Sequence, residues 1–251
     1  MKDLLYRASK PFTELDSEKL SKFEEFTRIM TDVNKSMNIT AITDSMGIAL
    51  KHHADSLSII STGLFSSDKK VCDIGCGGGF PGIPLKIAFP QMYINMIDST
   101  EKKINYLKNT ACLLGLENID FTSARAEELT RPEAKVSHRE KYDIATARAV
   151  ARLNVLCELC LPFVKPGGYF LSMKGQKAPE EAAEAQNAVL QLGGKIKEVR
   201  KINFTLPEEY LSLPDAAEFC NSERYIVIIE KIKKTPMNYP RQYSAIKKKP
   251  L

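Results

Sequence analysis

Apolar residues recur at spacings of three and four in the first part of the chain, which is the pattern of amphipathic helices. One run covers residues 20–37 and begins after Asp16-Ser17, a pair suited to cap a helix. A second run covers residues 43–62 and is followed by Gly63, a residue that commonly ends helices. We therefore expect residues 1–66 to form an N-terminal helical cap.

After residue 66 the pattern changes, and short apolar runs alternate with helical periodicity. Strands are expected at residues 70–74, 92–97, 118–123, 142–147, 169–173, 195–205 and 224–232. Helices are expected after the first strand and at residues 99–115, 154–164 and 179–192, with a charged surface loop at 131–141 and no helix between the last two strands. This order predicts an α/β domain over residues 67–231 with a doubly wound, seven-stranded sheet.

The first predicted strand leads into a glycine-dense turn, V-C-D-I-G-C-G-G-G-F-P-G-I-P at residues 71–84. Glycines allow a backbone to come close to a bound cofactor. The pattern D-x-G-x-G-x-G differs from the nicotinamide fingerprint because Phe80 occupies the last position, and no Lys-Ser/Thr pair follows as in a P-loop. The acid Asp73 suits a ligand with positive charge, such as S-adenosylmethionine. The alternative is an α/β turn that binds no ligand.

Together these features are similar to class I S-adenosylmethionine-dependent methyltransferases, which have a Rossmann-like sheet and bind ligands at the carboxyl ends of the strands. Asp98 ends the second predicted strand, where an acid can accept hydrogen bonds from a ribose. Ala126 and Glu127 follow the third strand and could meet an adenine edge. Four cations lie near the same edge and suit a phosphate-rich substrate, although each alone could form an ordinary ion pair: Arg125, Arg148, Lys174 and Arg224.

The turn after the fourth strand, residues 145–149, holds neither an Asn/Asp-Pro-Pro-aromatic set for an exocyclic amine nor a cysteine to attack a pyrimidine. Nitrogen 7 of guanine would suit such a site, because its lone pair is free and no proton must leave before attack. Positioning alone can lower such a barrier by about 7–11 kcal/mol. His52 and Asp55 lie three residues apart on a predicted helix. Together they could act as a general base, or they could form a structural cap or hydrogen bond.

Composition and charge narrow the class of protein. The 251 residues are 43% hydrophobic and 27% charged, with no apolar run long enough to span a membrane and no secretory signal at the start. Six scattered cysteines suggest reduced thiols and a cytoplasmic protein, with Cys157 and Cys160 expected in a packed core rather than at a metal. Of the net charge of +5, residues 231–251 contribute +7. This basic tail, assigned to residues 232–251, could contact RNA or be a disordered, solubilising segment.

The chain resembles the ribosomal RNA small subunit methyltransferase G family, also called glucose-inhibited division protein B. The resemblance runs from the first helices to the last residue, and the segment F-P-G-I-P-L is its most specific part. The matching motifs are N-I-T-A-I at 38–42, H-x-x-D-S-L at 52–57, D-I-G-C-G-G-G-F-P-G-I-P-L at 73–85, D-S at 98–99, R-A-E at 125–127, R-A-V-A at 148–151, K-G at 174–175, Y-P-R at 239–241 and a closing K-P-L.

The resemblance implies an enzyme that transfers a methyl group from S-adenosyl-L-methionine to nitrogen 7 of one guanine in 16S ribosomal RNA. It implies the small ribosomal subunit as partner, a cytoplasmic location, a monomer, and neither a metal nor a membrane. The family holds its cofactor at positions matching Gly75, Phe80, Ala126, Glu127 and Arg148, and the general fold adds Gly77, Gly79 and Asp98. Candidate residues for catalysis or RNA are His52, Asp55, Arg125, Arg148, Lys174 and Arg224. Lys103 stands where the family often has Arg, so a bidentate contact there is in doubt.

Three other functions stay open at this point. A nicotinamide-dependent oxidoreductase is disfavoured by Asp73 and Phe80 in the glycine turn. A non-catalytic RNA-binding or assembly protein with a vestigial pocket is disfavoured by the intact glycine turn. A methyltransferase for a protein or a small molecule is disfavoured by the basic tail.

Overall fold

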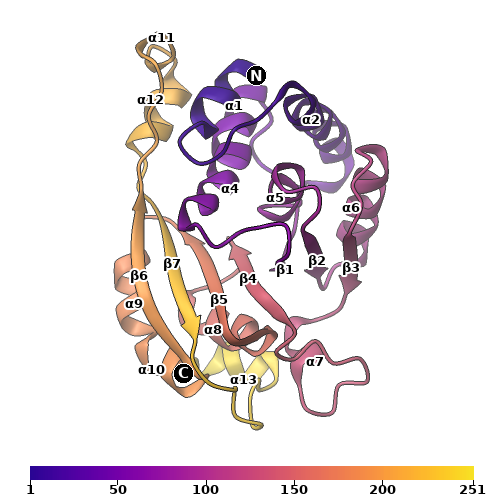
Figure 1. Ribbon diagram of the computed structural model, residues 1–251, viewed down its shortest axis with the longest axis vertical. Helices are drawn as coiled ribbons and strands as arrows, with labels where there is room; N and C mark the ends of the chain where they lie inside the picture. Colours follow the sequence, from indigo (N-terminus) through magenta and orange to yellow (C-terminus); the bar gives the residue numbers. More distant parts are fainter.

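A seven-stranded sheet forms the centre of the protein, with helices on both faces (Figure 1). The computed structural model describes residues 1–251, apart from the side chain of Pro214. The strands lie in the order β3-β2-β1-β4-β5-β7-β6, and β7 is antiparallel to both neighbours. Their bounds are β1 Lys70–Ile74, β2 Tyr93–Asp98, β3 Ile119–Ser123, β4 Tyr142–Arg148, β5 Val164–Lys174, β6 Gly194–Ile202 and β7 Arg224–Lys231. The predicted doubly wound sheet is confirmed, and its order reverses between β1 and β4, where such sheets bind ligands.

Helices precede, connect and follow the strands. The cap consists of α1 Lys2–Ser9, α2 Ser17–Met37, α3 Ser45–Gly47, the π-helix η1 Ile48–Ala54, α4 Asp55–Leu57 and the 3-10 helix η2 Ser58–Thr62. The later helices are α5 Gly82–Ala88, α6 Glu101–Leu113, α7 Ala126–Thr130, α8 Leu153–Cys160, the 3-10 helix η3 Leu161–Phe163, α9 Ala178–Glu184, α10 Gln186–Gln191, α11 Glu208–Leu211, α12 Pro214–Asn221 and α13 Tyr243–Lys248. Among the described residues, no helix has both the length and the apolar character needed to cross a membrane.

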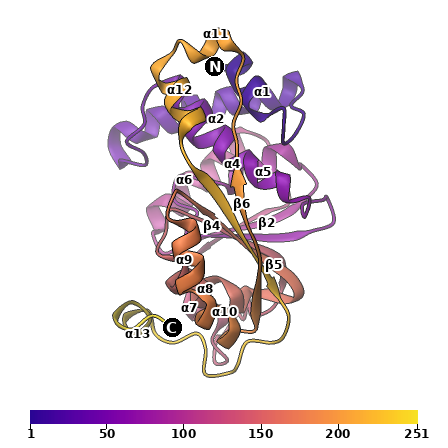
Figure 2. The ribbon, with the colours of Figure 1, turned by 90° about the vertical axis from the view of Figure 1, so that its left-hand side faces the viewer.

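Different helices cover the two faces of the sheet (Figure 2), and each face carries a separate apolar core. On one face the cap helices pack with α5 and α6, and the fully buried Phe23 and Phe26 of α2 belong to this core. On the other face α8, α9 and α10 cover the sheet. Cys157 and Cys160 are fully buried there, as expected for core thiols. The cap is therefore part of one hydrophobic core with the sheet.

The cap follows the apolar pattern in its first part and departs from it in the second. Helix α2 begins after Asp16, whose carboxylate accepts a hydrogen bond from the Lys19 amide at 2.8 Å, and it is capped at its C-terminal end by Asn38 with φ +50°. The second predicted helix does end at Gly63 but is not one α-helix. Its central seven residues form the π-helix η1, in which carbonyls pair with amides five residues ahead.

The predicted helix at residues 154–164 is too long. Helix α8 ends at Cys160, a short 3-10 turn follows, and Val164 already pairs with Tyr142 at the start of β5. The segment 166–168, Pro-Gly-Gly, lies inside the strand. The register between β4 and β5 shifts at this point, and such an irregularity tolerates proline and glycine in a strand.

The expectation of no helix between β6 and β7 is also wrong, because α11 and α12 lie there. These helices extend beyond the sheet beside the cap (Figures 1 and 2). Lys51 of η1 forms ion pairs of 2.9 Å with Asp215 and Glu218, while Phe219 is fully buried in the cap-side core. Such short helices have little intrinsic stability, so these tertiary contacts hold them in place.

One histidine is fully enclosed in the cap-side core. His53 lies between the rings of Phe23 and Phe26, with centroid distances of 5.0 and 5.4 Å. Its Nε2 is 2.8 Å from Thr27 Oγ1, which itself donates to the Phe23 carbonyl, so Nε2 carries the proton and Nδ1 has no partner among the described residues. Burial lowers the pKa of His53 to about 3.

Protonation of His53 should therefore oppose folding as the pH falls. Between the ordinary histidine pKa near 6.5 and the folded-state value of about 3, the unfolded chain binds one proton more than the folded chain. The contribution to the free energy of unfolding then falls by about 1.4 kcal/mol per pH unit below pH 6. We expect urea melts of the wild type and His53→Gln to converge as the pH is lowered from 7 to 4. Stability curves that stay parallel over this range would contradict the assignment.

Candidate functional site

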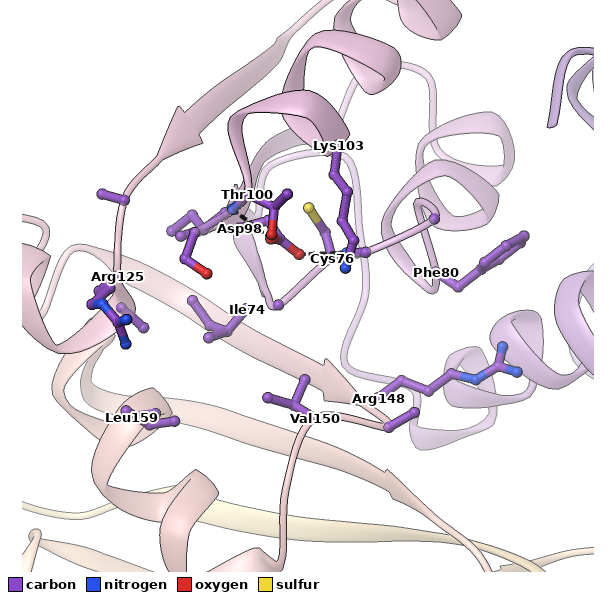
Figure 3. Close-up of a pocket in the computed structure, with 18 of the residues that line it drawn as sticks. Ile74, Cys76, Phe80, Asp98, Thr100, Lys103, Arg125, Arg148, Val150 and Leu159 are labelled. Atoms are coloured by element: carbon purple, nitrogen blue, oxygen red, sulfur yellow. Dashed lines mark hydrogen bonds between the residues drawn. The ribbon is translucent and has the colours of Figure 1, made fainter. Parts of the chain in front are cut away.

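A cavity of about 550 Å³ opens at the carboxyl ends of β1, β2, β3 and β4 (Figure 3). Loops after these strands form most of the wall, and the cap and the C-terminal tail complete it. Of the residues expected at the site, the following line the cavity: His52, Gly75, Gly77, Phe80, Asp98, Arg125, Ala126, Glu127 and Arg148. Four described residues from the same expectation lie outside the lining: Asp55, Gly79, Lys174 and Arg224.

Asp98 is fixed at the end of β2 by two backbone amides. Its Oδ2 accepts a hydrogen bond from Gly77 at 3.0 Å, and its Oδ1 accepts one from Thr100 at 2.8 Å. Gly77 has φ +52°, a backbone conformation that glycine adopts without strain and that turns its amide toward the carboxylate. Each carboxylate oxygen can accept a further hydrogen bond, so Asp98 can also hold a diol such as a ribose.

Two other residues of the glycine turn, Gly79 and Asp73, lie outside the cavity lining and stabilise the loop. Gly79 has φ +101°, and a Cβ there would lie 2.9 Å from Ile83, so Gly79 faces the helices rather than the cavity. Asp73 is fully buried outside the cavity lining and accepts a hydrogen bond from the Gly82 amide at 2.9 Å. Burial raises the pKa of Asp73 to about 7. The acid of the motif therefore holds the start of α5, rather than facing a cationic ligand as the sequence suggested.

One end of the cavity is built by the segment after β3. Arg125 precedes α7, and Ala126 and Glu127 form its first turn. Burial raises the pKa of Glu127 above its ordinary value. Figure 3 shows Arg125 and Leu159 at this end of the pocket and Phe80 and Arg148 at the other. An apolar wall with a carboxyl group at its edge can recognise a flat, hydrogen-bonding ring such as adenine.

Arg148 dominates the opposite end, where β4 meets the cap. Its NH2 group donates to the Lys51 carbonyl at 2.6 Å and lies 3.3 Å from His52 Nδ1. Its NH1 group donates to the His52 carbonyl at 3.2 Å and to Ser56 Oγ at 2.9 Å. Its Nε forms an ion pair of 3.2 Å with the buried carboxylate of Asp55. The Arg148 guanidinium is therefore directed at the π-helix η1 and at helix α4, which follows it.

His52 is held in one tautomer between two partners. Because Arg148 is a donor, Nδ1 of His52 must accept, and the proton resides on Nε2, which lies 2.7 Å from Thr40 Oγ1. The ring stacks on Phe80 with a centroid distance of 4.6 Å and an interplanar angle of 21°. Burial, assisted by the charge of Arg148, lowers the pKa of His52 to about 4. His52 is thus a neutral, oriented ring in the cavity wall.

The remaining predicted residues have partners behind the cavity. Asp55 is buried and forms an ion pair with a second cation, Arg224, whose Nε lies 3.4 Å from Oδ1. Lys174 donates to the Ala151 carbonyl at 2.6 Å and to Glu181 at 2.8 Å. Glu181 also accepts from the amide of Leu153, the first residue of α8. These contacts fix the cap and the loop after β4 from outside the cavity.

Several lining residues were not expected from the sequence. Val150 lies against Gly75, where a Cβ would approach to 2.6 Å, and Ile39 lies equally close to Gly78. Tyr243 reaches the cavity from the C-terminal tail, and its ring lies 5.6 Å from the Arg125 guanidinium. Val150 belongs to a motif quoted above and Ile39 to another, so proximity to those motifs was the available signal. Tyr243 offered none beyond its place in a basic tail.

Among the described residues, no group of three or more His, Cys, Asp or Glu side chains is arranged to hold a metal ion. Cys157 and Cys160 are packed in the second core, and burial raises the pKa of both thiols. Thiols of this kind are structural and unreactive.

Comparison with known proteins places this geometry in a family. The family model described as rRNA small subunit methyltransferase G matches residues 19–206. Two curated proteins named ribosomal RNA small subunit methyltransferase G, from Alkaliphilus metalliredigens and Lysinibacillus sphaericus, are each 42% identical to this chain. The first alignment covers 94% of this chain and 92% of that protein, and the second covers 95% and 93%.

Solved structures support the fold at lower sequence identity. The TYW2 protein of M. jannaschii, solved in complex with AdoMet, superposes with a TM-score of 0.51 at 18% identity, covering 76% of this chain and 80% of that one. A likeness of this extent supports the class I methyltransferase architecture. The family model matches more than half of the chain, and the two curated relatives are 42% identical to it over nearly its whole length. The chain belongs to the ribosomal RNA small subunit methyltransferase G family.

Proposed function

We propose that this protein transfers a methyl group from S-adenosyl-L-methionine to nitrogen 7 of one guanine in 16S ribosomal RNA. The observation that carries the proposal is the cavity at the switch point of the sheet, with Asp98 fixed by two amides, in a chain of this family. We further propose that the protein acts as a monomer on the small ribosomal subunit in the cytoplasm.

The cavity fits the proposed cofactor in its chemistry. Asp98 would hold the ribose hydroxyls, because each of its oxygens keeps a free acceptor site. Ala126 and the buried Glu127 would meet the adenine edge. Gly75 and Gly77 leave room for the methionine end. When bound, S-adenosyl-L-methionine supplies an activated methyl group.

Phe80, Arg148 and Gly79 would act through the shape of the site. Phe80 and the stacked His52 form an aromatic wall at the cap end of the cavity. Arg148 lines the cavity but directs its donors at the cap, so we assign it a positioning role. Gly79 has no Cβ and therefore allows the loop to pack closely against α5.

The chemistry needs no base from this chain. Nitrogen 7 of guanine attacks with an in-plane lone pair that carries no proton, so the site must hold the base in line with the methyl group. His52 has both ring nitrogens engaged and stays neutral above pH 5. We therefore assign His52 to the wall against which the guanine is oriented, and Asp55 to the ion pairs that fix that wall.

Cations at the rim would meet the RNA backbone. Arg125 and Lys103 line the cavity, and Lys247, Lys248 and Lys249 are exposed on or next to α13. Positive groups around a cavity favour phosphate contacts without selecting a sequence. Lys174 and Arg224 are engaged with Glu181 and Asp55, so we assign them to positioning the loop and the cap rather than to the RNA.

The proposed reaction should give one modified base. Labelled methyl from S-adenosyl-L-methionine would be offered to small subunits from cells lacking the enzyme, and the product mapped by chemical cleavage at 7-methylguanine. We expect label at a single guanine of 16S RNA, which is the specificity proposed above. Absence of label while the cofactor still binds would contradict the proposal and favour a non-catalytic RNA-binding protein.

Asp98 should control cofactor affinity. In Asp98→Asn the amide NH₂ would face the Gly77 or Thr100 amide, and the charged acceptor for the ribose would be lost. A hydrogen bond to a charged group contributes about 1.5–3 kcal/mol, so we expect the Kd of S-adenosylhomocysteine to rise about 10- to 100-fold by calorimetry. Asp120→Asn is the matched control, because Asp120 is exposed on β3 and bonds Tyr93 outside the cavity lining. Equal affinities for wild type and Asp98→Asn would remove Asp98 from the site.

The methylation rate should show no pH dependence that comes from the ionisation of His52. Since the pKa of His52 lies near 4, its charge does not change between pH 5.5 and 8. The rate at saturating cofactor should therefore lack an ionisation near pH 6.5 that depends on His52. The measurement compares pH–rate profiles of the wild type and His52→Gln. A limb near pH 6.5 in the wild type that the variant lacks would show that His52 acts as a base.

A further inference from the structure

We propose that Tyr243, which the C-terminal tail carries to the cavity, closes the adenine end of the cofactor site and packs its ring against the base. The inference rests on the proposed function, because it takes the cavity to hold S-adenosyl-L-methionine. It gives part of the basic tail a role in cofactor binding, in addition to any contact with RNA.

The tail is anchored beside the cavity by an ion pair between the partly exposed Arg241 and a buried carboxylate. Glu158 of α8 is fully buried, and Arg241 donates to it through Nε at 2.9 Å and NH2 at 2.6 Å, while the Arg241 amide adds a third bond of 2.7 Å. A buried carboxylate with three donors fixes its partner in direction as well as distance. Two residues later the chain enters α13, so the position of Tyr243 follows from this anchor.

Further contacts hold the tail on both sides of Arg241. Arg139, in the loop before β4, donates to the carbonyls of Thr235 at 2.6 Å and Tyr239 at 2.8 Å. Ile246 of α13 is fully buried in the core on the α8 side of the sheet. Figures 1 and 2 show α13 on the face of the sheet covered by α8. The loop at residues 131–141, expected only to be a surface loop, thus serves to dock the tail.

The docked tail places an aromatic ring next to the position proposed for the cofactor base. Tyr243 lines the same cavity as Arg125, Ala126 and Glu127, which form its adenine end. The Arg125 guanidinium lies over the tyrosine ring, 5.6 Å from its centroid, so one cation steadies the ring at the cavity mouth. Aromatic rings stack favourably on nucleobases, and such contacts do not require hydrogen-bond readout.

The test is the affinity for S-adenosylhomocysteine, measured by calorimetry on the full chain. Tyr243→Ala should raise the Kd about 5- to 100-fold, the range that loss of one base–aromatic contact gives. Tyr243→Phe keeps the ring and should bind within about twofold of the wild type. Ser244→Ala, at an exposed neighbouring position on α13, is the matched control and should bind as the wild type does.

A second ligand separates a contact with the base from a general loosening of the site. 5′-Methylthioadenosine lacks the amino-acid end, so Tyr243→Ala should weaken it by the same factor as S-adenosylhomocysteine. Wild-type affinity in Tyr243→Ala would overturn the inference and leave the proposed function intact. Equal losses in Tyr243→Ala and Ser244→Ala would also overturn it, because they would show displacement of α13. A wild-type chain that binds neither ligand would overturn the proposed function as well.

Discussion

The rest of the site depends on the contact between the guanidinium of Arg148 and the cap. It stands at the carboxyl end of β4 and reaches across to the cap, where it meets two carbonyls, a hydroxyl, a ring nitrogen and the carboxylate of Asp55. A planar group with five fixed donors can satisfy such a set, and a lysine cannot. Removing it would leave Asp55 buried with only the more distant Arg224, a loss of the kind that costs about 3–5 kcal/mol. The cap and the sheet thus share a polar contact as well as a core.

The π-helix in the cap becomes understandable from the same contact. A π-helical segment shifts the pairing of its carbonyls and amides by one residue and is often found at functional sites. Here the carbonyls of Lys51 and His52 accept hydrogen bonds from Arg148, the His52 carbonyl in addition to one from the Asp55 amide, and the ring of His52 lies on Phe80. The local irregularity and the aromatic wall of the cavity are therefore two results of one arrangement. This arrangement keeps the neutral ring of His52 in a fixed orientation in the cavity wall.

The sequence was informative where local chemistry decides the structure. The glycine turn and the acid Asp98 could be placed, because a strand, a tight turn and a helix follow one another within one unit of the chain. The partners of Arg148 could not be predicted, since they lie more than 90 residues earlier and in a helical type that apolar spacing does not distinguish. Helices α11 and α12 were missed because their stability comes from contacts with the cap. Tyr243 was missed because only the docking of Arg241 on the buried Glu158 brings it to the cavity.

These contacts divide the predicted residues between two tasks. Asp98, Glu127, Gly75 and Gly77 face the cavity, whereas Arg148, which also lines it, is paired with Asp55 and holds the cap in place. The division is tested most directly by a crystal structure of the chain with S-adenosylhomocysteine. The account predicts that the Arg148 guanidinium keeps its bonds to the carbonyls of Lys51 and His52 when the ligand is bound. A guanidinium that has left the cap to bind the carboxylate of the ligand would contradict it.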